Sequence, residues 1–300
     1  MKESMGDLAN KAKKKILQNR TAQRLFASFG NELQPARWIF LLGCYNSGTT
    51  LLRGMLARHP DIAALPSEGV RLTDVLPRPE EYHWPRMWCR SVKHVRLPDG
   101  PEQARRAARI KRHWSFFFPP QAENLLEKSI ANSARMPFLE AHFRPAYFIY
   151  LVRDGYAVAE GIRRKARPGE RGNPIYREEY PIGLCAEMWR ETDRLIEQDS
   201  AGVGRFLQVS YEDLSAEPEA VCRRITDFLE LPPLDEAVLG ENWTVHGVES
   251  PIRNMNRASF ERLSAEEIDK IHQVAGERLE ALGYDRPEGG SAGEGPGDDT

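Results

Sequence analysis

The chain has 300 residues, of which 41% are hydrophobic and 9% aromatic, enough apolar mass for a large core and too much for a disordered or collagen-like chain. Its 42 Lys and Arg against 44 Asp and Glu give a formal net charge of -2, which excludes a strong global attraction to nucleic acid or anionic membranes. The four cysteines form no C-x-x-C pair, which argues against zinc ribbons and a disulfide framework. With no long apolar run and no signal-peptide core, we expect a cytoplasmic protein.

The two ends of the chain differ in charge. Residues 1–30 carry seven Lys or Arg against two acids, and apolar residues spaced among the lysines predict that 1–34 is an amphipathic helical extension. It would pack on the domain or make a weak membrane-surface or partner contact. Residues 285–300 carry five acids, one Arg and five glycines, so we expect a disordered tail.

Apolar runs alternate with helical patterns between these ends. Runs typical of buried parallel strands cover 37–43, 146–153 and 205–211. Helical patterns follow them at 49–59, 157–165 and 219–231, with a last helix at 265–282. This alternation predicts a single α/β domain over 35–284, with a central parallel sheet covered by helices in three layers.

Residues 71–121 interrupt the alternation and read as an insertion or cap. The segment carries eleven Lys or Arg against five acids, together with Trp84, Trp88 and Trp114. Arginine forks suit carboxylate, phosphate or sulfate, and aromatic faces suit sugars or phenols. The segment is therefore expected to bind an anionic acceptor, with a solvated basic lid over a small aromatic core as the alternative.

A phosphate-binding loop is predicted where the first strand meets the first helix. Gly43 and Gly48 have the spacing of a P-loop, and backbone N–H groups converge on an anion at such a junction. Thr49 replaces the lysine that nucleotide hydrolysis needs, and no well-placed metal-binding aspartate is evident apart from Asp154. The loop therefore suits a single phosphate better than a triphosphate with Mg²⁺.

Four segments, in a fixed order, resemble a known family. N-S-G-T-T-L-L-R-G-M-L-A-R-H-P (46–60) and F-I-Y-L-V-R-D-G-Y-A-V-A-E-G-I-R-R-K (148–165) are similar to the 5′-phosphosulfate loop and the 3′-phosphate strand and helix of sulfotransferases that use 3′-phosphoadenosine 5′-phosphosulfate (PAPS). L-E-K-S (126–129) and the Y-E-D-L segment within 209–232 resemble two further family motifs. These motifs are more similar to those of the bacterial, tyrosylprotein and carbohydrate sulfotransferases than to those of the cytosolic small-phenol enzymes.

The resemblance implies a P-loop fold, PAPS as co-substrate, no metal and a set of donor-binding residues. Those residues are Asn46, Ser47, Gly48, Thr49, Thr50, Arg153, Gly161, Lys165, Tyr211 and, by an approximate match in the loop 250–268, Arg257. Arg253 and Asn254 are further candidates in that loop. Two positions depart from the family, with Asn46 in place of a cation and Gly161 in place of a serine. Lys128 would compensate for the first, and Arg164 or Lys165 for the second.

The resemblance also implies catalytic roles for two residues. In-line sulfuryl transfer needs stabilisation of the leaving oxygen, assigned to the loop amides and Lys128, and a base for the acceptor hydroxyl. Glu68, in S-E-G-V-R (67–71), resembles the glutamate-bearing stretch of tyrosylprotein sulfotransferases. His83 and His142 are the alternative bases.

The predicted acceptor is a hydroxyl on a glycan, a glycolipid or a tyrosine, and the candidate molecules that carry it include an anionic glycan and an acidic peptide. Two other functions stay open at this stage. One is a P-loop kinase-like phosphotransferase, which Thr49 disfavours, and the other is a nucleic-acid-binding protein using the basic stretches 1–30 and 71–121. No nucleic-acid partner is expected under the preferred interpretation.

Overall fold

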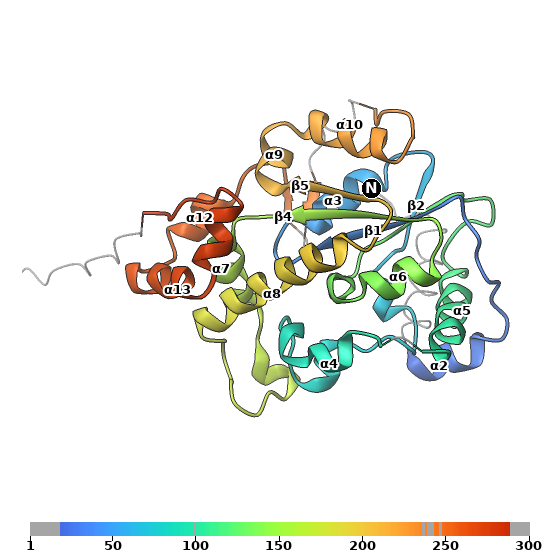
Figure 1. Ribbon diagram of the computed structural model, residues 1–300, viewed down its shortest axis with the longest axis horizontal. Coiled ribbons are helices and arrows are strands. Elements are labelled where there is room, and N and C mark those ends of the chain that lie inside the picture. Colours follow the sequence, from blue (N-terminus) through green and yellow to red (C-terminus); the bar gives the residue numbers. More distant parts are fainter. Residues whose placement is uncertain (1–18, 99, 236–237, 239–242, 246–247, 289–300) are drawn as a thin grey trace, which may run out of the picture.

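A five-stranded parallel sheet forms the centre of the computed structural model, which describes residues 19–98, 100–235, 238, 243–245 and 248–288 (Figure 1). The strand order is β2-β3-β1-β4-β5, and every pairing is parallel. The strands are β1 (Arg37–Gly43), β2 (Ile62–Ala64), β3 (Asn124–Glu127), β4 (Ala146–Val152) and β5 (Phe206–Ser210). The predicted fold class is confirmed. Sequence analysis missed β2 and β3 because runs of three and four residues give no period to read.

Alternate residues of the central strands enter two different cores. Trp38, Phe40 and Leu42 of β1 face one core, and Ile39 and Leu41 face the other because successive strand side chains point to opposite faces. The first core is covered by α5 (Glu102–Trp114), α6 (Met136–His142) and part of α8 (Ile182–Ser200). The second is covered by α3 (Thr49–Leu56), α9 (Tyr211–Ala216) and α10 (Pro218–Phe228). Figure 1 shows helices on both sides of the sheet.

A third core lies at one end of the sheet. There α7 (Gly155–Lys165), α8 and α13 (Ala265–Ala281) pack together, next to α12 (Asn256–Phe260) (Figure 1). The helix α7 begins two residues earlier than predicted because Asp154 caps it, its carboxylate accepting from the amides of Tyr156 and Ala157. The other predicted helices are found with shorter C-terminal ends, and a two-stranded hairpin, β6 (Trp243–Val245) and β7 (Val248–Ser250), precedes α12.

The predicted cap is more regular than its sequence indicates. It contains η2 (Pro79–Tyr82), η3 (Trp88–Ser91), α4 (Val92–Val95) and the 13-residue α5, and it follows η1 (Gly69–Arg71). Three further short helices complete the described elements: η4 (Ile130–Ala134), η5 (Pro168–Arg171) and α2 (Arg20–Phe26). Sequence reasoning missed α5 because six basic side chains in 13 residues hide its apolar stripe of Ala107, Ile110 and Trp114.

The described part of the N-terminal extension packs on the cap. Gln23 of α2 is buried, its side chain donates to the Arg71 carbonyl, and its own carbonyl bonds the His113 ring. Most of the predicted amphipathic helix lies outside the described residues, as does most of the 285–300 tail. Among the helices that the structure describes, none is both long enough and apolar enough to cross a membrane.

Candidate active site

A cavity of about 720 Å³ opens at the carboxyl ends of the strands, where parallel sheets usually bind ligands. Every strand leads into a segment that lines it: β1 into the loop 43–50, β2 toward Glu68, β3 into Lys128, β4 into Arg153 and β5 into Tyr211. Among the residues that the structure describes, eleven Lys or Arg and three Glu line the cavity. A chain of net charge -2 thus carries a strongly cationic site, as expected for an anionic ligand.

The predicted phosphate loop joins β1 to α3 and lines the cavity with Asn46, Gly48, Thr49 and Thr50. Gly48 has φ 90°, and a Cβ there would lie 2.6 Å from the Tyr211 ring, so only glycine fits the turn. Ser47 differs from the other predicted loop residues because it is buried beneath the loop, at 1% exposure, and does not line the cavity.

Arg153 is buried between the loop and the C-terminal segment. Its Nη1 donates to the Asn46 carbonyl oxygen at 2.6 Å and its Nε to Asn256 Oδ1 at 2.8 Å. The guanidinium also lies over the Tyr211 ring, 4.2 Å from the ring centroid. Burial lowers the pKa of Arg153, but an arginine stays charged in proteins. The structure therefore places a fixed positive charge beside the loop, as predicted.

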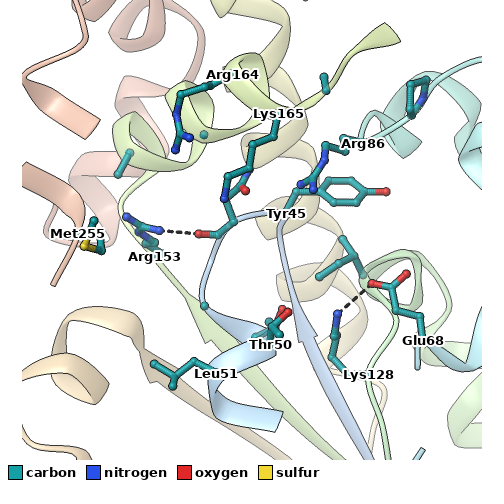
Figure 2. Close-up of a pocket in the computed structure, with 18 of the residues that line it drawn as sticks. Tyr45, Thr50, Leu51, Glu68, Arg86, Lys128, Arg153, Arg164, Lys165 and Met255 are labelled. Atoms are coloured by element: carbon teal, nitrogen blue, oxygen red, sulfur yellow. Dashed lines mark hydrogen bonds and ion pairs between the residues drawn. The ribbon is translucent and has the colours of Figure 1, made fainter. Parts of the chain in front are cut away.

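The last turn of α7 adds two cations, Arg164 and Lys165 (Figure 2). Arg164 Nε donates to Glu160 Oε1 at 2.8 Å, whereas Lys165 makes no ion pair with any residue that the structure describes. Burial lowers the pKa of Lys165, and the neighbouring guanidinium groups, chiefly that of Arg164, lower it further. An anion at this position would relieve that repulsion between cations.

The two departures from the family pattern lie against each other. A Cβ at Gly161 would be 3.0 Å from Asn46 Cγ and 3.2 Å from its Nδ2. The Asn46 side chain therefore occupies space next to the bare α7 backbone, and Nδ2 is buried without a protein partner. Both residues line the cavity, so a larger side chain at either position would have to displace the other.

Glu68 and Lys128 meet at the opposite side of the cavity (Figure 2). Lys128 Nζ donates to Glu68 Oε1 at 2.9 Å, and their side chains are 11% and 25% exposed. The structure thus brings together the two residues predicted to be catalytic. His83 and His142 do not line the cavity, and the His83 ring instead bonds the Arg171 carbonyl.

Tyr211 lines the cavity and Arg257 does not. The Tyr211 hydroxyl donates to the Arg253 carbonyl and accepts from the Met255 amide, so it fastens the C-terminal loop over the cavity. Arg253 and Met255 line the cavity. The Arg257 side chain is 91% exposed and pairs with Glu261. The expectation that Arg257 contacts the donor has no support in this geometry, because α12 turns its side chain to solvent.

The cap does not contribute the aromatic surface that was expected. Trp88 and Trp114 are fully buried, and Trp84 stacks on Tyr180 away from the cavity. These rings are core because the cap is folded and must bury its own apolar side chains. Several arginines of the cap also form ion pairs with acidic side chains, as Arg109 does with Asp74. The cap still supplies Arg71, Arg78 and Arg86 to the cavity.

Sequence reasoning also missed a buried carboxylate next to Lys128. Glu127 is 1% exposed, accepts from the Gly69 amide at 2.7 Å, and receives side-chain hydrogen bonds from Ser129 and Asn132. Burial raises the pKa of Glu127 to about 7, although the bonds from Ser129 and Gly69 act to lower it. The sequence signal that could have indicated this residue is an acidic side chain directly after the apolar pair Leu125 and Leu126.

Several known proteins are similar to this chain in sequence or in fold. Residues 35–236 match the Sulfotransferase family. Protein-tyrosine sulfotransferase 1 of Danio rerio is 32% identical over 233 residues, covering 73% of this chain and 60% of that protein. The sulfotransferase domain from the curacin biosynthetic pathway has a TM-score of 0.53 at 22% identity, covering 83% and 98% of the two chains.

A sulfotransferase of Mycobacterium avium shares the fold, with a TM-score of 0.56 at 15% identity over 91% of this chain and 85% of that one. This chain spans between 51% and 65% of the lengths of the curated relatives that it matches. The family match covers the sheet and all five segments that lead from it into the cavity. The chain belongs to the sulfotransferase family.

Proposed function

We propose that the protein transfers a sulfuryl group from PAPS to an acceptor hydroxyl and releases adenosine 3′,5′-bisphosphate. The observation that carries this proposal is the Glu68–Lys128 pair, 2.9 Å apart at the rim of a P-loop that lacks the P-loop lysine. The pair places a proton acceptor and a cation side by side. Sulfuryl transfer needs both, one for the entering oxygen and one for the leaving oxygen.

The cavity fits the proposed donor in size and charge. Its volume of about 720 Å³ lies within the range of nucleotide-sized ligand sites. The loop amides and the hydroxyls of Thr49 and Thr50 would hold the 5′-phosphosulfate end, while Arg153 and Lys165 would hold the 3′-phosphate. PAPS supplies an activated sulfuryl group, whose bond to the 5′-phosphate breaks as the acceptor oxygen attacks.

The catalytic roles follow from the two side chains at the rim. Glu68 would take the proton from the acceptor hydroxyl as its oxygen forms the new bond to sulfur. The electron pair of the broken sulfur–oxygen bond goes to the 5′-phosphate, where Lys128 and the loop amides would stabilise the charge. Lys128 bonds the Glu68 carboxylate in the structure. During the reaction it would bond the leaving oxygen of the 5′-phosphate instead, as Glu68 takes up the proton.

The proposed acceptor is a hydroxyl of a tyrosine, a glycan or a glycolipid, within an anionic molecule. The similarity to protein-tyrosine sulfotransferase 1 of Danio rerio supports a tyrosine. Arg71, Arg78 and Arg171 on the cap side of the cavity support an acceptor that carries acidic groups. The buried cap tryptophans remove the argument for a sugar-stacking surface.

Transfer of labelled sulfate from PAPS to tyrosine peptides, glycans and phenols tests the proposal. Glu68→Gln should abolish turnover of the best acceptor because an amide cannot take the proton, while calorimetric binding of adenosine 3′,5′-bisphosphate stays unchanged. A fully active Glu68→Gln variant would assign the base to another residue. Failure of the wild type to label any member of the panel, with no binding of adenosine 3′,5′-bisphosphate, would overturn the function itself.

A further inference from the structure

The loop that carries Glu68 is held by side chains on either side of Lys128. The Gly69 amide donates to Glu127 Oε1 at 2.7 Å, and the Val70 amide donates to Ser129 Oγ at 3.1 Å. The Gly69 carbonyl accepts from Trp114 Nε1 at 3.1 Å. Three backbone groups directly after Glu68 are thus bonded to side chains that are fully or almost fully buried.

Strand geometry explains how residues 127–129 both hold the loop after Glu68 and present Lys128 to the cavity. Glu127 ends β3, and Ser129 continues in an extended conformation with φ -129° and ψ 124°. Successive side chains of an extended chain point to opposite faces, so Glu127 and Ser129 turn into the protein while Lys128 turns into the cavity. The tripeptide therefore fixes the loop after Glu68 and also carries the cation that bonds the Glu68 carboxylate.

The fit at Gly69 is tight. A Cβ on Gly69 would lie 2.6 Å from the Trp114 ring and 2.7 Å from Glu127 Cγ, so the backbone approaches these side chains as only glycine can. Glu127 also accepts hydrogen bonds from Ser129 and Asn132. Its carboxylate is the common acceptor of this cluster, and no other buried acceptor is bonded to the Gly69 amide among the described residues.

We propose that Glu127 is a positioning residue for the reaction: by accepting the Gly69 amide, it fixes the Glu68 carboxylate against Lys128 and toward the acceptor hydroxyl. This inference rests on the proposed function, in which Glu68 is the base. It assigns no proton transfer to Glu127, which does not line the cavity. A small displacement of a catalytic group costs a large part of the rate, so the effect should fall on turnover.

Glu127→Ala tests the proposal, because it removes the acceptor. We expect kcat to fall about 10- to 100-fold, with the KM for PAPS and the affinity for adenosine 3′,5′-bisphosphate unchanged. Glu127→Gln keeps an oxygen for the Gly69 amide and should restore most of kcat. Asn124→Ala is the matched control: Asn124 is buried at the other end of β3 and bonds the Asp61 carbonyl, so its loss should leave kcat unchanged.

Hydrogen exchange of the Gly69 amide gives a readout that is independent of sulfuryl transfer. Protection should be lost in Glu127→Ala and kept in Glu127→Gln and Asn124→Ala. If Glu127→Ala does not fold, Ser129→Ala, which removes the Val70 acceptor, should lower kcat severalfold with donor affinity unchanged. Wild-type kcat in a folded Glu127→Ala, or equal losses in the Ala and Gln variants, would overturn the positioning role. Absence of transfer by the wild type would instead overturn the proposed function.

Discussion

The proposed donor side of the cavity, formed by the loop 43–50, Arg153 and Lys165, and the proposed acceptor side, formed by Glu68, Lys128 and the cap arginines, are built by different means. On the donor side, the binding groups follow β1 and β4 directly, and these strands pair in register from Trp38 and Ala146 to Gly43 and Leu151. On the acceptor side, Glu68 lies four residues beyond β2 and reaches a partner 60 residues away, at Lys128. The donor site therefore depends on strand pairing, whereas the acceptor site depends on individual side-chain contacts.

This difference predicts how each side responds to substitution. Donor-side groups are anchored by the central sheet, so removing a side chain there should delete the contacts of that side chain, as with the bonds of Arg153 to Asn46 and Asn256, and leave the strands in place. Acceptor-side groups hold one another, as in the Arg71 contacts with Glu68 and Glu80. Changes there should alter acceptor recognition and leave donor affinity intact.

Arg153→Ala should have the largest effect on binding. The 3′-phosphate would lose a buried cation whose hydrogen bonds to a charged ligand contribute about 1.5–3 kcal/mol, so the affinity for adenosine 3′,5′-bisphosphate should fall about 100-fold by calorimetry. Arg153→Lys should lose less because it keeps the charge but not the planar fork.

Arg257→Ala is the matched control for Arg153→Ala. Arg257 is also an arginine of the predicted donor set, but its side chain is 91% exposed and pairs with Glu261. Donor affinity should be unchanged in this variant. Equal losses of affinity in the Arg153 and Arg257 variants would mean that affinity follows the total positive charge of the protein. The assignment of the donor site to the cavity beside Arg153 would then be wrong.

Arg71→Ala should have a smaller effect, confined to the acceptor. Arg71 is about half exposed and lies beside Glu68, with Nε 3.8 Å from Glu68 Oε2. An exposed ion pair contributes up to about 1 kcal/mol, so the KM for an acidic acceptor should rise about fivefold, while that for a neutral acceptor and the donor affinity stay the same. An equal change for acidic and neutral acceptors would remove the argument for an anionic acceptor.

The donor side was largely predictable from sequence because its chemistry follows from local structure. A strand, a glycine loop and a helix in succession place Thr49 and Thr50 at an anion site, and a basic residue directly after a buried strand places Arg153 at the same sheet edge. Ser47 and Arg257 were assigned by motif and register, and neither lines the cavity. A match in sequence gives a residue's position along the chain but not the direction of its side chain.

The acceptor side was predictable only in part. Glu68 and Lys128 were each found by resemblance, but their 2.9 Å contact requires β2 and β3 to be neighbours, and both strands are too short to show a pattern. The expected aromatic binding surface of the cap is missing for another reason. Trp88 and Trp114 look available in a basic segment, yet α5 folds and buries Trp114 against Trp38. Composition cannot separate a binding ring from a core ring.

Asp154→Asn offers the most delicate test of the donor side, because it concerns the start of α7 and not a ligand contact. Burial raises the pKa of Asp154 from 3.8 to about 7, although the hydrogen bonds from the Ala157 and Tyr156 amides act to lower it; the nearby Glu212 carboxylate contributes to the increase. The folded state therefore holds a proton that the unfolded state has released across this interval, so this group stabilises the fold less as pH rises from about 4 to 7. Asparagine has no such titration and still caps the helix through its oxygen.

The free energy of unfolding of Asp154→Asn relative to wild type should therefore rise between pH 5 and pH 6, by on the order of 1 kcal/mol, measured by urea denaturation. Asp154→Ala removes both the titration and the cap, so it should follow the asparagine variant with pH but lie about 1 kcal/mol below it throughout. If the difference in the free energy of unfolding between Asp154→Asn and wild type stays constant with pH, Asp154 is ionised in the folded protein. The buried start of α7 would then carry a negative charge beside Arg153, and the donor side would be less cationic than its lining residues indicate.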